Sequence, residues 1–259
     1  MIGIIYFIVI VLANTIGAIA GMGGGVIIKP VLDFIGAHSV AAISFYSTVA
    51  VFTMSIVSTS QQMKSGMEFN WAKIIWISIG ALAGGGLGNT VFEFLLWGFN
   101  NASTVQLIQI IITILTLLFA FLYSKYEWIS YDLNTVAWYV LCGLVLGFLA
   151  SLLGIGGGPI NVSLMMLMFA MPIKEATVYS ICTIFFSQLS KLVTIWLSTG
   201  FQRYDLTVLL YIIPAAIVGG LLGAKSSKIL PPQKVTFVFQ CVVIVVFIIN
   251  IYNGWVLLW

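Results

Sequence analysis

The chain has 259 residues, of which 61% are hydrophobic and 7% are charged, and its mean hydropathy is +1.16. Soluble domains carry about 25% charged residues, so this composition excludes a soluble protein and predicts an integral membrane protein surrounded by a lipid bilayer. The net charge is only +3 and the basic residues are scattered, so nothing indicates a nucleic-acid partner.

About eight apolar segments follow one another along the chain, each near the roughly 20 residues that a spanning helix needs. They are predicted at residues 2–20, 40–62, 71–96, 104–123, 134–153, 176–197, 206–229 and 235–252. Two shorter apolar pieces, at 26–34 and 159–171, fit half-helices or re-entrant segments. The first segment lacks the basic start of a signal peptide, so we expect it to be a retained helix. The predicted fold is an all-α polytopic membrane protein.

A glycine-rich stretch follows the first segment and recurs once. Residues 21–25 read Gly-Met-Gly-Gly-Gly, and residues 154–158, which begin 133 positions later, read Gly-Ile-Gly-Gly-Gly. Each glycine costs up to about 1 kcal/mol in a helix relative to alanine, so both stretches predict helix breaks. Such breaks at membrane depth are tolerated where they are buried in protein or line a wet cavity. Two of them at matching positions indicate a transporter's binding site, although close helix packing through small residues is the alternative.

Further motif pairs repeat in the same order as the glycine stretches. They are Tyr46-Ser47 with Tyr179-Ser180, Lys64-Ser65-Gly66 with Ser198-Thr199-Gly200, and the glycine clusters at 84–88 and 219–223. We therefore expect two repeated halves of four spanning helices, at residues 1–125 and 133–259, joined by a polar loop at 126–132. An odd number of crossings per half would make the repeats inverted, whereas the count of four plus four predicts parallel repeats.

A polar stripe runs along the segment at 176–197 and onto its end. Its members recur every three or four residues, which places them on one face of a helix: Ser180, Thr183, Ser187, Ser190, Lys191, Thr194 and Ser198. The segment at 40–62 has a weaker version: Ser44, Ser47, Thr48, Ser55, Ser58, Thr59 and Gln62. Hydroxyls can hold helices together, at roughly 0.6 kcal/mol each. The lysine among them favours a path for a polar solute, unless its ammonium reaches the membrane surface along its own stem.

A glycine loop that opens a half-helix offers free backbone N–H groups and the positive end of the helix dipole, and both favour an anion. We predict that the two loops meet near the membrane midplane around one small anion. The predicted substrate-binding residues are Gly23, Gly24, Gly25, Ser47, Gly156, Gly157, Gly158, Asn161, Ser180, Ser187 and Lys191. The second choices are Lys29, Tyr46, Lys174 and Tyr179, where the two lysines have possible loop ion pairs with Asp33 and Glu175.

Other chemistries find little support in the sequence. No Gly-Lys-Ser/Thr follows either glycine stretch, which argues against a nucleotide site. The scattered ionisable groups include no nucleophile–base pair, so we expect no enzyme activity and no cofactor. Cys142, Cys182 and Cys241 are too far apart for a metal site or a disulfide framework.

The paired Gly-x-Gly-Gly-Gly loops, each followed by a serine in the next spanning segment, resemble the sulfite exporter TauE/SafE family. The stretch from Gly219 to Pro231 resembles that family as well, and the resemblance covers nearly the whole chain. It implies a secondary transporter of sulfite, thiosulfate or organosulfonates in a cell membrane, the plasma membrane of a prokaryote. A passive channel for a small polar solute is the alternative, and formation of a homo-oligomer stays open.

Two features depart from the family pattern. The proline that usually follows each glycine loop is present as Pro30 in the first half, but in the second half Pro159 lies further forward. Tyr46 and Tyr179 stand where the family has small residues. These departures bear on the substrate more than on the fold.

Overall fold

The computed structural model describes residues 2–63, 70–99, 101–126 and 128–258. It is all-α, and no strand forms in these ranges. The helices are α1 (Ile2–Ala20), α2 (Gly25–Ile35), α3 (Val40–Met63), α4 (Trp71–Phe99), α5 (Ala102–Tyr126), α6 (Val136–Leu153), α7 (Pro159–Phe169), α8 (Ile173–Ser198), η1 (Leu206–Val208), α9 (Leu209–Ile229) and α10 (Pro232–Leu258). Eight helices among the described residues are long and apolar enough to cross a membrane. The predicted multi-pass membrane fold is confirmed.

The local sequence explains where several helices begin or end. Gly36 caps α2 and Gly154 caps α6, both in the left-handed conformation, with φ of 66° and 67°. Glycine is favoured at such positions because it has no Cβ to clash with the backbone. Pro232 begins α10, where its missing N–H has no helical partner to lose. The predicted segments thus match the helices, with α4, α5, α8 and α10 extending beyond the predicted bounds.

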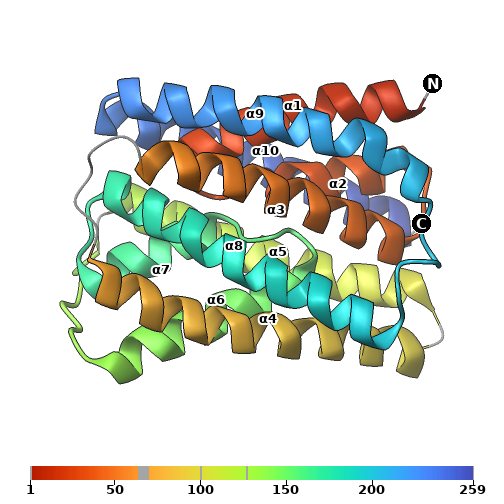
Figure 1. The fold of residues 1–259 in the computed structure, drawn as a ribbon, viewed down its shortest axis with the longest axis horizontal. Coiled ribbons are helices and arrows are strands. Elements are labelled where there is room, and N and C mark those ends of the chain that lie inside the picture. Colours follow the sequence, from red (N-terminus) through yellow and green to blue (C-terminus); the bar gives the residue numbers. More distant parts are fainter. Residues whose placement is uncertain (1, 64–69, 100, 127, 259) are drawn as a thin grey trace.

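The two halves are interleaved (Figure 1). The first helix of each half packs most extensively on the third long helix of the other half: α1 lies along α9, and α6 lies along α4. The polar helices follow the same rule, because α3 packs on α9 and α8 packs on α4. At the centre, equivalent helices meet each other, α3 with α8 and α5 with α10. Each half therefore completes the core of the other.

Contacts between helix ends give the direction of each element. The Tyr6 hydroxyl, near the start of α1, lies 2.8 Å from Nδ1 of His38, which follows α2. Phe34 of α2 contacts Tyr252, near the end of α10, with ring centroids 5.5 Å apart. The start of α1, the end of α2 and the end of α10 therefore share one end of the bundle, where Figure 1 marks both termini. We call this end the termini face.

Other helix ends gather at the opposite end of the bundle. Asn70, which precedes α4, donates its backbone N–H to the hydroxyl of Tyr179 near the start of α8 (3.1 Å). Gln240, near the start of α10, donates to the carbonyl oxygen of Ser124 near the end of α5 (3.2 Å). We call this end the lysine face because six lysines lie near it: Lys73, Lys125, Lys174, Lys225, Lys228 and Lys234.

The two halves run in opposite directions through the membrane. The first half starts at the termini face and leaves α5 at the lysine face, and the second half returns from there to the termini face. The predicted parallel repeats are wrong. The cause is the short helix α2, which turns back from the glycine loop to the face where α1 began, so that only α3, α4 and α5 make net crossings. An odd number of crossings inverts a repeat, and α6 with α7 forms the equivalent hairpin.

We propose that the repeats are residues 1–125 and 133–259, joined by 126–132, because both ranges contain one long helix, then one short helix, then three long helices. One marker of the repeat, at 64–66, lies outside the described residues.

Small residues let α4 and α6 approach closely. A methyl group built on Gly143 of α6 would overlap the carbonyl oxygen of Ile77 in α4, and one on Gly84 of α4 would overlap that of Leu144. The backbones themselves form this interface, as in other membrane helix pairs rich in small residues. Glycines therefore allow close packing of α4 on α6, in addition to forming the two glycine loops.

We expect Gly143→Ala to destabilise the protein by about 1–3 kcal/mol, because the added methyl group overpacks the α4–α6 interface. Gly98→Ala is the matched control, since its methyl group meets no atom within 4 Å. The melting temperature of the purified protein in detergent measures both effects. Equal melting of the two variants would contradict the close approach of α4 and α6.

The inverted arrangement also separates the charges. The lysine face carries six lysines, whereas the termini face carries Arg203 in the α8–α9 connection. Positively charged loops stay in the cytoplasm. We therefore expect the lysine face to be cytoplasmic and the start of α1 and the end of α10 to lie outside.

Cysteine labelling in intact cells checks this orientation. The background variant has the three native cysteines replaced by alanine, and it carries either Asn101→Cys on the termini face or Ser130→Cys on the lysine face. A membrane-impermeant maleimide should label the Asn101→Cys variant in intact cells and the Ser130→Cys variant only after lysis. The reverse pattern would overturn the assignment.

Candidate substrate-binding site

The two glycine loops contact each other in the middle of the bundle. A methyl group built on Gly25 would overlap the carbonyl oxygen of Ile155 in the other loop. Gly23 and Gly156, with φ of 71° and 67°, adopt the left-handed conformation that side chains avoid. The structure therefore brings the predicted glycines together, and the absence of side chains allows the two backbones to touch.

Branched side chains from the two polar helices cover the loops. A methyl group on Gly156 would come within 2.8 Å of Val51 in α3, and one on Gly157 would come within 2.6 Å of Ile184 in α8. Val51 and Ile184 are separated by the repeat offset and are fully buried. The space directly beside these glycines is thus filled by protein in this conformation.

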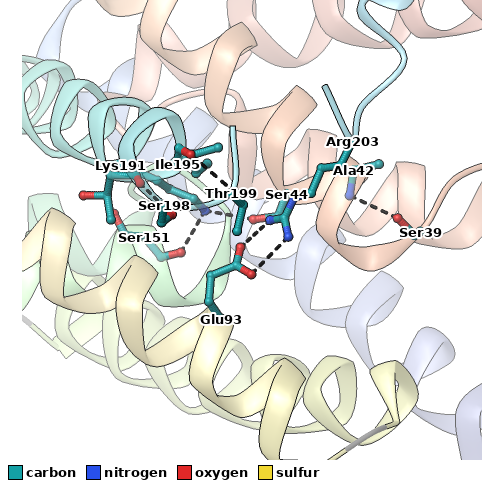
Figure 2. A network of polar contacts seen from close by, with 11 residues as sticks. Ser39, Ala42, Ser44, Glu93, Ser151, Lys191, Ile195, Ser198, Thr199 and Arg203 are labelled. Carbon is teal, nitrogen blue, oxygen red and sulfur yellow. Dashed lines mark hydrogen bonds and ion pairs between the residues drawn. The ribbon is translucent and has the colours of Figure 1, made fainter. Parts of the chain in front are cut away.

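Lys191 lies in a buried polar cluster on the termini-face side of the loops. Its side chain is 0% exposed, so it does not reach the membrane surface along its stem. The ammonium Nζ donates to Ser44 Oγ at 2.8 Å and to the carbonyl oxygen of Ser151 at 2.9 Å, as Figure 2 shows. Nζ also lies 5.6 Å from the ring centroid of Phe92 in α4. Within the described ranges, no carboxylate forms an ion pair with Lys191.

The second-choice lysines occupy different places. Lys29 of α2 is 3% exposed, and its Nζ forms an ion pair with Asp33 at 2.8 Å. A methyl group on Gly154 would lie 2.5 Å from Ser44 Oγ and 3.3 Å from Lys29 Cε, so Lys29 borders the Lys191 cluster. Lys174 lies in the first turn of α8 at the lysine face, away from that cluster.

Two of the predicted serines are bonded to nearby backbone. Ser180 Oγ donates to the carbonyl oxygen of Gly21 at 2.5 Å, which ties α8 to the first glycine loop. Ser187 Oγ donates to the carbonyl oxygen of Ile184 at 3.0 Å within α8. In this conformation, these two hydroxyls hold the scaffold of the site.

Two other predicted polar residues have buried atoms without a hydrogen-bond partner in the described structure. They are Ser47 of α3, through Oγ, and Asn161 of α7, through both amide atoms. Asn161 lies in the first turn of α7, and a methyl group on Gly157 would be 3.3 Å from its side-chain nitrogen. Burying an unpaired polar group costs roughly 1–3 kcal/mol in proteins. These atoms, on α3 and at the start of the half-helix α7, are therefore available to a polar solute.

The two tyrosines stabilise opposite ends of the bundle. The Tyr46 hydroxyl donates to the carbonyl oxygen of Asp205 at 3.0 Å at the termini face, and that of Tyr179 accepts from the N–H of Asn70 at the lysine face. The Asp205 carboxylate caps η1, and hydrogen bonds from the hydroxyl and N–H of Thr207 lower the pKa of Asp205.

An ion pair lies near the Lys191 cluster at the termini face. Glu93, next to Phe92 in α4, pairs with Arg203 from the α8–α9 connection (Figure 2). Sequence reasoning missed this pair, because 110 residues separate its partners. It also missed Ser151, which contributes a backbone oxygen that no residue pattern reveals. Ser44 was visible as a member of the polar stripe at 40–62.

Comparison with known proteins identifies relatives along the chain. The family described as sulfite exporter TauE/SafE matches residues 6–249. The probable membrane transporter protein YunE of Bacillus subtilis (strain 168) is 26% identical over 94% of this chain and 95% of its own length. The probable membrane transporter protein MJ0441 of Methanocaldococcus jannaschii is 25% identical over 84% of this chain and 81% of its own length. No solved structure matches the chain.

We expect Tyr46→Phe and Tyr179→Phe each to lower stability by about 0.5–1.5 kcal/mol, because each loses one hydrogen bond that joins a helix to a connecting segment. Neither should change the affinity for thiosulfate, because both hydroxyls face the ends of the bundle. Thermal unfolding and thiosulfate binding are measured side by side, with the exposed Tyr131→Phe as control. Weaker thiosulfate binding at unchanged stability would instead assign the tyrosines to the substrate-binding site.

Proposed function

Because the chain belongs to the sulfite exporter TauE/SafE family and is a multi-pass cell-membrane transporter, we propose that it carries a small sulfur-containing anion by secondary transport. The observation that carries this proposal is the fully buried ammonium of Lys191, which has only neutral partners in the described structure.

The chemistry of Lys191 favours an anion. An ammonium group has three N–H donors, and Ser44 and Ser151 accept two of them. An isolated buried charge is costly unless it is paired, so a small anion at the third donor position would compensate the charge. A neutral solute would leave it uncompensated.

The asymmetry between the halves supports a charged site on one side of the loops. At the repeat offset, Ser58 of α3 corresponds to Lys191, and Val162 of α7 corresponds to Lys29. Ser44 corresponds to Thr177, which is also a hydroxyl residue. The fold thus forms without a lysine at the equivalent positions. The lysines are an addition to the polar helices near the termini face, as expected of a ligand site.

The proposed anion site extends from Lys191 to the glycine loops. The unpaired Ser47 hydroxyl and Asn161 amide would donate to the anion, together with backbone N–H groups at the starts of α2 and α7. Val51 and Ile184 fill the space beside the glycines, so passage of the anion requires these side chains or the loops to move. That requirement fits a transporter that binds its solute and then changes conformation.

A panel of anions, with the zwitterion taurine, tests the substrate class. Purified protein is heated with sulfite, thiosulfate, sulfoacetate, taurine, sulfate or phosphate. A ligand at 100 times its Kd stabilises the folded state by about 2.7 kcal/mol. We expect the sulfur-containing anions to raise the melting temperature and phosphate to do so less. Flux into proteoliposomes should saturate with anion concentration, whereas a passive channel would give flux that rises linearly.

We expect Lys191→Met to weaken thiosulfate binding by about 10- to 100-fold, because a hydrogen bond to a charged group contributes about 1.5–3 kcal/mol. Methionine keeps much of the stem volume and removes the charge. Lys174→Met is the matched control and should bind as the parent does, since Lys174 lies at the lysine face. Parental affinity in a folded Lys191→Met variant would remove Lys191 from the site.

A further inference from the structure

A cavity at the termini face has the end of α2 in its wall. Its volume is about 180 Å³, and it lies between the end of α2, the start of α5 and the end of α10. Its lining residues are Asp33, Phe34, Gln106, Tyr252, Asn253, Val256 and Leu257. Because these residues come from the last or first turns of their helices, the cavity opens near the membrane surface. It is large enough for several water molecules.

Asp33 is the carboxylate in this cavity wall. Its side chain is only 3% exposed, and its Oδ2 accepts a hydrogen bond from Lys29 Nζ at 2.8 Å. Its Oδ1 is buried and has no hydrogen-bond partner in the described parts of the chain. A buried carboxylate oxygen without a partner is costly. Oδ1 lies behind the cavity wall and is the oxygen of this carboxylate that is still free to take up a proton.

Lys29 connects this carboxylate to the proposed anion site. Its stem borders Gly154 and Ser44, and Ser44 accepts a hydrogen bond from Lys191. Lys29 and Lys191 thus approach the same serine and the same glycine loop from two helices. Only Lys29 has a carboxylate partner in the described structure.

The ion pair is not needed to build a helix of this kind. The equivalent helix α7 also has 11 residues, and at the repeat offset it carries Val162 and Met166 where α2 has Lys29 and Asp33. A structural role for the pair would be expected in both halves. The Lys29–Asp33 pair, like Lys191, has no charged counterpart in the other half.

We propose that Asp33 is the proton-coupling site of this transporter. A proton that enters through the cavity binds to Oδ1 and converts the carboxylate into a neutral acid. Lys29 keeps its own proton, loses its carboxylate partner, and becomes available to the anion that Lys191 holds. The inference rests on the proposed function, because it presupposes an anion beside Lys191.

Charge balance gives the reason for the coupling. With Asp33 ionised, the three groups Lys29, Asp33 and Lys191 carry a net charge of +1, and with Asp33 protonated they carry +2. A dianion such as thiosulfate is then matched by the two ammonium groups. Uncompensated charge at membrane depth costs several kcal/mol, so proton and dianion bind more favourably together than separately.

Other titratable groups surround Asp33, and the test has to separate their effects from that of Asp33. Tyr6 faces it from α1, and Tyr252 faces it across the cavity from α10. His38 follows α2, contacts the Tyr6 hydroxyl, and packs edge-on against Tyr46 of α3. An imidazole can take up a proton, so His38 is the competing proton carrier.

The test measures thiosulfate affinity of the full chain in detergent over a series of pH values. Thiosulfate is the probe because it keeps its charge over the neutral range. In the parent, Kd should fall by up to about tenfold for each unit that the pH decreases, as expected when one proton binds with the ligand. Asp33→Asn, which mimics the protonated acid, should remove this dependence and bind at high pH as tightly as the parent does at low pH.

Control variants separate coupling from a structural role. Asp205→Asn changes an exposed carboxylate on the same face, and His38→Gln removes the competing carrier; both should keep the pH dependence of the parent. The double variant Lys29→Val/Asp33→Met copies the equivalent residues of α7 and serves if Asp33→Asn does not fold. It should bind thiosulfate weakly and without pH dependence. In proteoliposomes, thiosulfate should drive proton uptake with the parent and only thiosulfate flux with Asp33→Asn.

The outcomes distinguish this inference from the proposed function. A parent that binds thiosulfate with no pH dependence overturns the coupling alone, as does an Asp33→Asn variant that keeps the dependence. Loss of the dependence in His38→Gln assigns the proton to His38 instead. If the parent neither binds nor moves thiosulfate, sulfite or sulfoacetate, the proposed function fails and the coupling inference fails with it.

Discussion

The contact between two glycine loops is the constraint on which the rest of this structure depends. The backbone of Gly25 meets the carbonyl of Ile155 at a distance that leaves no room for a side chain. Helices α1 and α6 must stop there, and α2 and α7 must turn back. Each hairpin is then too short to bury itself, so it packs on the other half, α1 on α9 and α6 on α4. The interleaving of the repeats follows from the two breaks.

Burial of charge is the second constraint, and it acts on one side of the loops only. Lys191 and Lys29 lie among hydroxyls, backbone carbonyls and one carboxylate, whereas the equivalent positions of the other half hold Ser58 and Val162. Charges at membrane depth are costly and persist mainly where they serve a function. In the function that we propose, the duplicated scaffold supplies a polar crossing point, and the asymmetric lysines make one side of it a site for an anion. By our further inference, the neighbouring Asp33 would let the charge of that site respond to protons.

The inverted arrangement gives the lysine and termini faces different roles. Lysines collect at the ends of helices on one face, while the ion pair of Glu93 with Arg203 and the cavity of Asp33 lie on the other. An anion entering at the termini face would meet the buried ammonium groups before the glycine loops. An anion leaving from the lysine face would meet the loops first. The proposed anion would therefore meet different groups at the two faces, although the order of helices is the same in both halves.

The sequence by itself determined the membrane class, the helix positions and the two breaks, because hydropathy and glycine content act locally. It also identified Lys191, since a lysine inside an apolar helix stands out. It did not determine the direction of the repeats, because α1 is long enough to cross and only its contacts show that α2 returns to the same face. The sequence also did not reveal the hydrogen-bond partners of Lys191 or the position of Lys174. Ser44 lies near the start of α3, whereas Ser151 and Gly154 lie at the end of α6, more than 100 residues away, and tertiary packing alone brings these two helix ends together around a charge.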